Sequence, residues 1–134
     1  MAQPTNALPS AVQRCHELLA WLIPLLDQFP RSRRFTLGER LESGLLFVLE
    51  NLVDATYSRD KREALARANR RLAVTRHLWR LCLELEVIGL KRYEYGAKLM
   101  LALGGEIGAW LRARSAPPPP AESGPTGGAP TAPA

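Results

Sequence analysis

The sequence is poor in the side chains on which most catalytic and metal sites depend. It contains two cysteines, two histidines and three aspartates among 134 residues. The aspartates fall near the ends of the expected helices, where carboxylates serve as caps and dipole partners. Neither histidine has a glutamate three residues before it, as a di-iron carboxylate bundle requires. We therefore expect no catalytic residue, no metal and no cofactor, and we interpret the chain as a protein that is not an enzyme.

Long hydrophobic runs are also lacking. The longest strongly apolar stretch, residues 18–26, is nine residues long and contains Pro24, whereas a membrane span needs roughly 20 apolar residues. The first ten residues lack the basic and apolar segments of a signal peptide. Cys15 and Cys82 stand in apolar contexts without motif spacing, which favours free thiols in a reducing compartment. We expect a soluble, cytoplasmic protein that has no membrane partner.

The C-terminal segment has a composition that cannot form a core. Residues 115–134 contain seven of the eleven prolines, three of the ten glycines and no aromatic or large aliphatic residue. Such a segment buries too little to offset the entropy of ordering, so we expect a disordered tail rich in proline, glycine and alanine. Residues 1–9 are expected to be a flexible start. Residues 10–114 remain to fold as one domain.

The apolar residues of this domain recur at spacings of three and four, and no segment alternates as a strand does. We predict four helices: residues 10 to about 29, residues 36 to a turn around Ser58, residues 60 to about 88, and residues 91 to about 114. Helices of similar length joined by short loops pack as antiparallel neighbours. The fold class that follows is all-α, an antiparallel up-down-up-down four-helix bundle.

Polar residues and glycine mark the expected helix ends. Ser10 can cap the first helix, and the segment Thr36–Glu39 forms a capping box for the second. The residues between these helices, Arg31–Arg34, are then a basic connector. Asp60 can cap the third helix and Gly89 can end it.

Two features of the helices indicate contacts beyond simple bundle packing. The second helix has a core stripe and a neighbouring apolar arc, formed by Leu46, Phe47, Leu49 and Val53. A helix that is apolar over so wide an arc needs more than one partner surface, which hints at self-association. The fourth helix contains glycines at positions 96, 104, 105 and 108. Each costs roughly 1 kcal/mol relative to alanine in a helix, so we expect another backbone to approach closely there.

Positive charge dominates the domain, and most of it is arginine. Because Glu122 is the only charged residue of the tail, residues 1–114 carry 18 basic and 12 acidic groups, a net charge of +6, and 15 of the basic groups are arginines. Guanidinium suits phosphate and stacked bases better than ammonium does. At 100° per residue, one arc of the third helix combines Arg62, Asn69, Arg70, Arg76, His77 and Arg80. Charges so spread neutralise phosphates without reading sequence, so we expect salt-dependent, weakly specific binding of nucleic acid.

A second basic cluster stands at the entrance of the second helix, beside Phe35. The residues that we predict to contact nucleic acid are therefore Arg31, Arg33, Arg34, Arg40, Arg62, Arg70, Arg76 and Arg80. For any one of them the alternative is a solvated arginine paired along its helix, as Arg67 can pair with Glu63 at i,i+4. The three tryptophans lie on core stripes, which argues against base stacking by their rings.

The run from Phe29 to Leu41, FPRSRRFTLGERL, resembles the hallmark of the accessory variability determinant proteins of diversity-generating retroelements. Further matches in order and spacing are Trp21 and Pro24, then Leu72, Arg76, Leu78, Arg80 and Leu81, then Tyr93 and Glu94, and finally residues 107–111, which are similar to the Leu-Gly-Gly-Trp-Leu ending of that family. The likeness spans about residues 18–112. Within the run, the arginines are interpreted as functional, and the loop and packing residues are Phe29, Pro30, Phe35, Leu37, Gly38 and Leu41.

The resemblance implies a four-helix bundle that assembles as a homopentameric ring with a basic surface. It also implies partners: the reverse transcriptase of the same element, and RNA or DNA. In that role the protein, itself non-catalytic, supports the copying of a template-repeat RNA with adenine-directed errors and the transfer of the mutated cDNA into a target gene.

Two alternatives stay open. One is a stand-alone RNA-binding bundle of the type encoded in intervening sequences of ribosomal RNA genes, which shares the architecture and a similar Phe-Pro loop. The other is a module that binds only proteins. An adjacent reverse transcriptase gene, with a pair of near-identical repeats that differ at template adenines, would favour the retroelement role over both.

Overall fold

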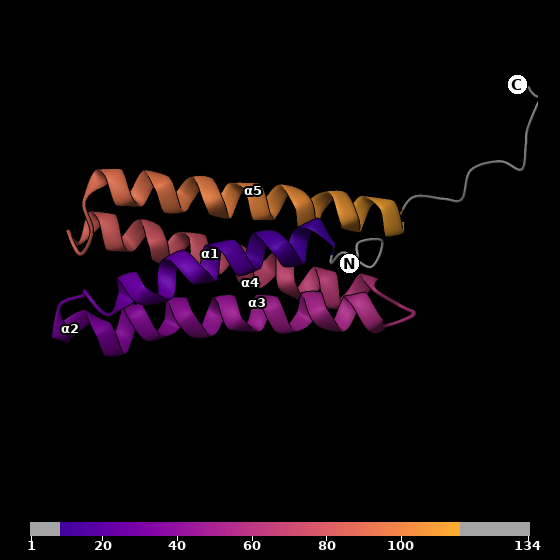
Figure 1. Cartoon of the computed structure of the whole chain (residues 1–134), viewed down its shortest axis with the longest axis horizontal. Helices are drawn as coiled ribbons and strands as arrows, with labels where there is room; N and C mark the ends of the chain where they lie inside the picture. Colours follow the sequence, from indigo (N-terminus) through magenta and orange to yellow (C-terminus); the bar gives the residue numbers. More distant parts are fainter. Residues whose placement is uncertain (1–8, 116–134) are drawn as a thin grey trace, which may run out of the picture.

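The computed structural model describes residues 9–115, which form an all-helical bundle (Figure 1). The long helices are α1 (Ser10–Leu26), α3 (Glu39–Tyr57), α4 (Arg62–Glu84) and α5 (Leu90–Ser115). A short helix α2 (Arg31–Arg33) and a π-helical turn η1 (Arg34–Gly38) join α1 to α3. The long helices alternate in direction (Figure 1), so the predicted antiparallel four-helix bundle is confirmed. Nearly all of the predicted tail and of the predicted flexible start lies outside the described residues; Ser115, where the tail was predicted to begin, is the last residue of α5.

Helices that follow one another in the chain also pack side by side, and α1 closes the bundle by packing against both α3 and α5 (Figure 1). The predicted core stripes are largely confirmed, because each has its central positions buried: Leu18 and Leu22 in α1, Leu41, Leu45, Val48 and Leu52 in α3, Leu65, Ala68, Leu72, Thr75, Trp79 and Cys82 in α4, and Met100, Leu103 and Ile107 in α5. Trp21 and Trp110 are half-buried at the margins of this core.

The first helix begins and ends differently from the prediction. Its N-cap is Pro9, and no side chain caps it, so Ser10 is the first helical residue rather than the cap. The helix ends at Leu26, not near Phe29. Pro24 has no N–H to donate to the turn before it, and after Leu26 the chain makes a tighter turn in which Phe29 N donates to Leu26 O at 3.1 Å.

The expected basic connector is itself helical. Pro30 stands before α2 with φ of −55°, and its carbonyl accepts hydrogen bonds from the N–H groups of Arg33 (2.8 Å) and Arg34 (2.9 Å). Helical structure therefore starts at Arg31, five residues before the predicted start. The capping box is wrong: Thr36 lies inside η1, and its hydroxyl donates to Arg33 O at 3.3 Å instead of accepting from a backbone amide. The fixed φ of Pro30 gives the helix an earlier start than Thr36 could.

Helix α4 starts near the predicted position but ends earlier. The Asp60 carboxylate accepts a hydrogen bond from Arg62 N at 3.3 Å, which agrees with a role at the start of the helix. The helix ends at Glu84, and Val87 N donates to Cys82 O (2.8 Å) while Glu86 N donates to Leu83 O (3.0 Å). These two bonds form a Schellman motif, in which the left-handed position is Glu86, with φ of 60°. The predicted stop, Gly89, instead accepts the first hydrogen bond of α5, from Tyr93 N.

Lysine and asparagine side chains hold the α3–α4 corner. The Lys61 ammonium donates to the carbonyls of Ala55 (2.7 Å) and Ser58 (2.8 Å), with a longer contact to Thr56 (3.4 Å), at the end of α3. One turn earlier, the buried Asn51 accepts a hydrogen bond from Arg67 Nε of α4 at 2.9 Å. Unpaired carbonyls at a helix C-terminus carry partial negative charge, so the ammonium neutralises this end of α3.

The glycines of α5 do not mark the close approach of another backbone. A Cβ on Gly96 would lie 2.5 Å from Cζ2 of Trp79, so this glycine makes room for an indole ring. A Cβ on Gly105 would meet nothing within 4 Å. The prediction from the four glycines was therefore wrong in its cause: one of them fits against a large aromatic side chain of α4, and another faces open space.

Within residues 9–115, no helix combines the length and the apolar character needed to cross a membrane.

Candidate nucleic-acid interface

Charge is distributed unevenly over the helices. Helix α4 carries six arginines and two glutamates, and α5 carries five basic and two acidic residues. The α2–η1 segment adds three arginines and no acid. Helix α3 has the opposite balance, with one arginine and four acidic residues. The positive potential is therefore strongest over α4, α5 and the α2–η1 turn, and the outer side of α3 is acidic.

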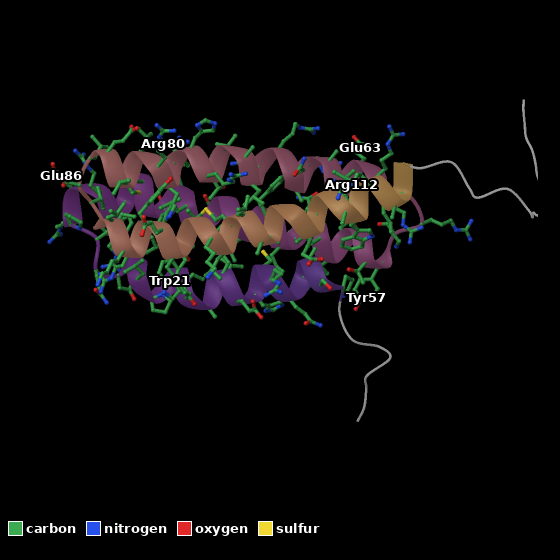
Figure 2. The ribbon with its side chains drawn as sticks, turned by 90° about the horizontal axis from the view of Figure 1, so that it is seen from above. Trp21, Tyr57, Glu63, Arg80, Glu86 and Arg112 are labelled. Atoms are coloured by element: carbon green, nitrogen blue, oxygen red, sulfur yellow. The ribbon has the colours of Figure 1, made fainter. Side chains whose placement is uncertain are left out.

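The four predicted arginines of α4 lie on its exposed side. Arg62, Arg70, Arg76 and Arg80 are all exposed, as are Asn69 and His77 on the same arc. They point away from the core because Leu65, Leu72 and Trp79 occupy the inner positions of the same turns. Figure 2 shows Arg80 and Glu63 toward opposite ends of α4. The separation between Arg62 and Arg80 along the axis is about 27 Å, from a rise of about 1.5 Å per residue.

Most of the predicted arginines have no acidic partner. Arg34 pairs with Asp27 at 3.0 Å and Arg80 pairs with Glu84 at 3.2 Å. Within residues 9–115, no ion pair forms at the other six predicted positions: Arg31, Arg33, Arg40, Arg62, Arg70 and Arg76. Both observed pairs are exposed, and such pairs contribute little, so a phosphate can compete for either guanidinium.

Arg67 and Arg71 of α4 are already engaged. Arg67 pairs with Glu63 at 3.6 Å, as its i,i+4 spacing predicts, and also lies 3.8 Å from Asp54 of α3. The Arg71 guanidinium lies over the Phe47 ring, 4.9 Å from its centroid. These two side chains serve the α3–α4 contact, which leaves the arc through Arg70 and Arg76 as the free part of the basic surface.

The α2–η1 turn presents the second predicted cluster at one end of the bundle. Arg31, Arg33 and Arg34 are exposed there, and so is Arg40, the second residue of α3. Figure 1 places this turn at the end of the bundle where α4 also ends, so the cluster lies at the Arg80 end and far from Arg62. The arginines form the two clusters expected from the sequence, but the structure does not bring all eight of them into one site.

Phe35 is the residue of this turn that sequence reasoning misinterpreted. Expected to be a packing residue, it is 64% exposed, and the Arg34 guanidinium lies 5.7 Å from its ring centroid. Phe29 provides the packing instead, because its ring is buried and lies against Gly38. An exposed phenylalanine among arginines is typical of surfaces that stack bases. The sequence did indicate that Phe35 is exposed, because Phe35 stands among four arginines, at positions 31, 33, 34 and 40, where a core residue is not expected.

The comparison with protein families decides the relationship. The model of a family described as bAvd-like matches residues 11–114. The chain belongs to the bAvd-like family. The match covers α1 to α5 and contains both arginine clusters, so the resemblance to accessory variability determinant proteins is confirmed. No curated protein matches the sequence.

The titratable side chains of the bAvd-like chain form neither a metal site nor a reactive thiol in the described residues. Among the described residues, no group of three or more His, Cys, Asp or Glu side chains is arranged to hold a metal ion. His16 and His77 are both exposed. The two cysteines are buried as free thiols, and burial raises the pKa of Cys15 to about 12 and that of Cys82 to about 11. Thiols that stay protonated at neutral pH are poor nucleophiles.

Proposed function

We propose that this chain is the non-catalytic accessory protein of a diversity-generating retroelement. In this role it holds template RNA, or the cDNA copied from it, while the reverse transcriptase of the element polymerises. Membership of the bAvd-like family supports the association with a diversity-generating retroelement. The observation that carries the nucleic-acid part is the arc of exposed α4 arginines, of which Arg62, Arg70 and Arg76 have no acidic partner in the described part of the chain.

The geometry suits the phosphate backbone rather than base sequence. Arginines at helical spacing along about 27 Å of α4 can contact successive phosphates of one strand. Binding is then weakly specific, and its affinity falls steeply with salt. Selection of the template belongs to the partner complex and not to α4.

The α2–η1 cluster, which comprises Arg31, Arg33, Arg34 and Arg40, is proposed as the second contact. It lies at one end of the bundle, beside the exposed Phe35. A compact turn with an aromatic ring among guanidinium groups offers a docking point for either the reverse transcriptase or a strand end. Charge reversal at Arg33 tests which of these two partners the cluster contacts.

Self-association is the third part of the proposal. Leu46 and Val53 of α3 are 37% and 39% exposed, and they lie on the helix with the acidic balance. A partly apolar helix face that the bundle itself leaves exposed suits burial against another copy, and repetition of such a contact closes a ring. We propose a homo-oligomer, with the pentamer implied by the family resemblance. Light scattering should give a mass near five chains, and a stable monomer would contradict this part.

Capture by the reverse transcriptase of the same element tests the function directly. Tagged wild-type chain, Arg33→Glu, Arg76→Glu and the control Arg14→Glu are mixed with the enzyme and template RNA. Arg14 is a suitable control because it lies on α1 and already pairs with Glu17. We expect Arg76→Glu to lose RNA, Arg33→Glu to lose at least one of the two partners, and Arg14→Glu to keep both. Full capture of enzyme and RNA by all three variants would contradict the assignment.

A further inference from the structure

A pocket of about 320 Å³ opens on the outer side of the bundle between α4 and α5. It exists because small side chains line it from both helices: Ala73 on α4 and Ala97 on α5. Had either alanine been a leucine, the side chain would fill the hollow. The pocket lies beside Arg76 and Arg80, at the C-terminal end of the basic arc of α4.

The floor of this α4–α5 pocket is rigid and apolar. It is formed by Trp79 and Met100, both buried, with Tyr93 beside them. The Trp79 indole N–H donates to Tyr93 O at 2.9 Å, and its ring packs edge-on against Trp21, 6.0 Å between centroids. A floor held at several points keeps its shape when a ligand enters, which reduces the entropy lost on binding.

The rim of the pocket is cationic. Arg76, His77 and Arg80 line it from α4, and no aspartate or glutamate of the described chain does so. Arg76 forms no ion pair within residues 9–115. Arg80 uses only its Nε toward Glu84, so its two terminal nitrogens stay available for an anion. Guanidinium groups bind phosphate in a bidentate manner and stack on flat rings.

Two other hollows of the described surface lack this combination. The one between α1, η1 and α3 is lined by Asp27, Glu39 and Glu42, which repel phosphate. The one between α3 and α4 is lined by Arg67, Arg70 and Arg71, but Arg67 already contacts acids and Arg71 lies over the Phe47 ring, which leaves Arg70 alone for an anion. The α4–α5 pocket therefore combines free cations with an unoccupied apolar floor.

We propose that the α4–α5 pocket takes one unpaired nucleotide of a bound strand, with its base between Ala73 and Ala97 and its phosphate on Arg76 and Arg80. This rests on the proposed function and adds to it a preference for single strands. An apolar floor under a cationic rim matches a flat ring joined to a phosphate. A volume near the lower end of small-molecule pockets admits a base but not a duplex, in which the ring faces are covered by stacking.

The test compares two single strands of equal backbone charge with a duplex that carries about twice that charge. The probes are an oligouridylate of about twelve nucleotides, the same chain with abasic riboses, and an RNA duplex of equal length; this length falls within the site sizes of single-strand binders. With wild-type protein, fluorescence anisotropy should show the oligouridylate bound about tenfold more tightly than the abasic chain or the duplex, since contact of one base with the pocket and its guanidinium groups is worth about that factor. Equal binding of oligouridylate and abasic chain would overturn the pocket and leave the proposed function intact.

Variants locate the preference on the protein. Ala73→Leu fills the pocket without changing charge and should weaken oligouridylate binding to the level of the abasic chain. Ala102→Leu, at an exposed alanine of α5 outside the pocket, should keep the tenfold preference. Arg76→Gln should weaken all three probes. A preference that survives Ala73→Leu would refute the pocket, and failure of wild-type protein to bind any probe at low salt would refute the nucleic-acid part of the proposed function as well.

Discussion

At the scale of single residues, Gly96 and Gly105 of α5 should respond oppositely to an added methyl group. We predict that Gly96→Ala lowers the free energy of unfolding by about 1–2 kcal/mol, because the Cβ would lie 2.5 Å from the buried Trp79 ring and overpacking exceeds the gain in helix propensity. Gly105→Ala should raise it by about 1 kcal/mol, since nothing lies within 4 Å. Urea unfolding followed by circular dichroism measures both. Changes of the same sign would contradict the packing described.

The two buried thiols predict a pH dependence. The pKa of Cys15 is raised to about 12 and that of Cys82 to about 11, from 9.0, so the folded state holds these protons more tightly than the unfolded chain. Their contribution to stability is complete below pH 9 and is lost as pH rises toward 11 and 12. Above pH 9 we expect the free energy of unfolding to fall by up to about 1.4 kcal/mol per pH unit for each thiol. A variant with both cysteines replaced by alanine should show a shallower slope, and identical slopes would argue against burial.

Residue exposure could be predicted from helical periodicity, whereas the pocket could not. At 100° per residue Arg70 lies about 160° from Leu72, opposite the buried stripe, whereas Arg76 lies about 40° from Leu72, at the margin of that stripe, and both are exposed. The pocket depends on Ala73 meeting Ala97 across two helices. That pairing depends on the relative register of α4 and α5, which the sequence of one helix does not contain.

At the scale of elements, the end of α4 is strained by Glu86. An L-residue in the left-handed region costs about 1–2 kcal/mol, which glycine avoids. Allowing for the greater freedom of glycine in the unfolded chain, we predict that Glu86→Gly stabilises the protein by about 1 kcal/mol. Glu84→Gly, two residues earlier and inside the helix, should destabilise it by a similar amount. Thermal denaturation of the two variants checks this, and a loss of stability in Glu86→Gly would contradict the Schellman geometry.

The end of α3 depends on Lys61. Replacing it with methionine keeps most of the apolar stem but removes the ammonium that holds the carbonyls of Ala55 and Ser58. We predict a loss of about 1–2 kcal/mol in the free energy of unfolding, the usual value for charged hydrogen bonds at a helix C-terminus. Lys98→Met, at an exposed position of α5, is the matched control and should change stability by less than about 0.5 kcal/mol. Equal effects at both lysines would argue against capping by Lys61.

Helix existence could be predicted far better than helix ends. The apolar stripes identified all four long helices, because burial of a whole face outweighs any single residue. The helix ends depend on neighbouring residues that compete to start or stop a helix, and the capping patterns in the sequence did not show which residue would prevail. Pro30 starts helical structure before Thr36 can act as a cap, and the Glu86 turn ends α4 before Gly89 is reached.

At the scale of the whole molecule, charge is separated across the bundle. Helices α4 and α5 and the α2–η1 turn carry the positive excess, while α3 is acidic. The net charge, which the sequence provides, does not show on which side of the bundle the positive charge lies. This placement follows from the order of packing, in which α4 and α5 are neighbours and α3 lies on the other side of α4 (Figure 1). The basic surface is therefore a side of the molecule and not its whole circumference.

The salt dependence of RNA binding tests the α4 surface most directly. The slope of log Kd against log salt concentration is measured for wild-type protein, for Arg62→Gln, Arg70→Gln and Arg76→Gln, and for the control Arg14→Gln on α1. Each α4 variant should reduce the slope by about 0.7–0.9, the value of one lost phosphate contact, and Arg14→Gln should leave it unchanged. Equal reductions in all four variants, or no reduction in any of them, would contradict binding through α4.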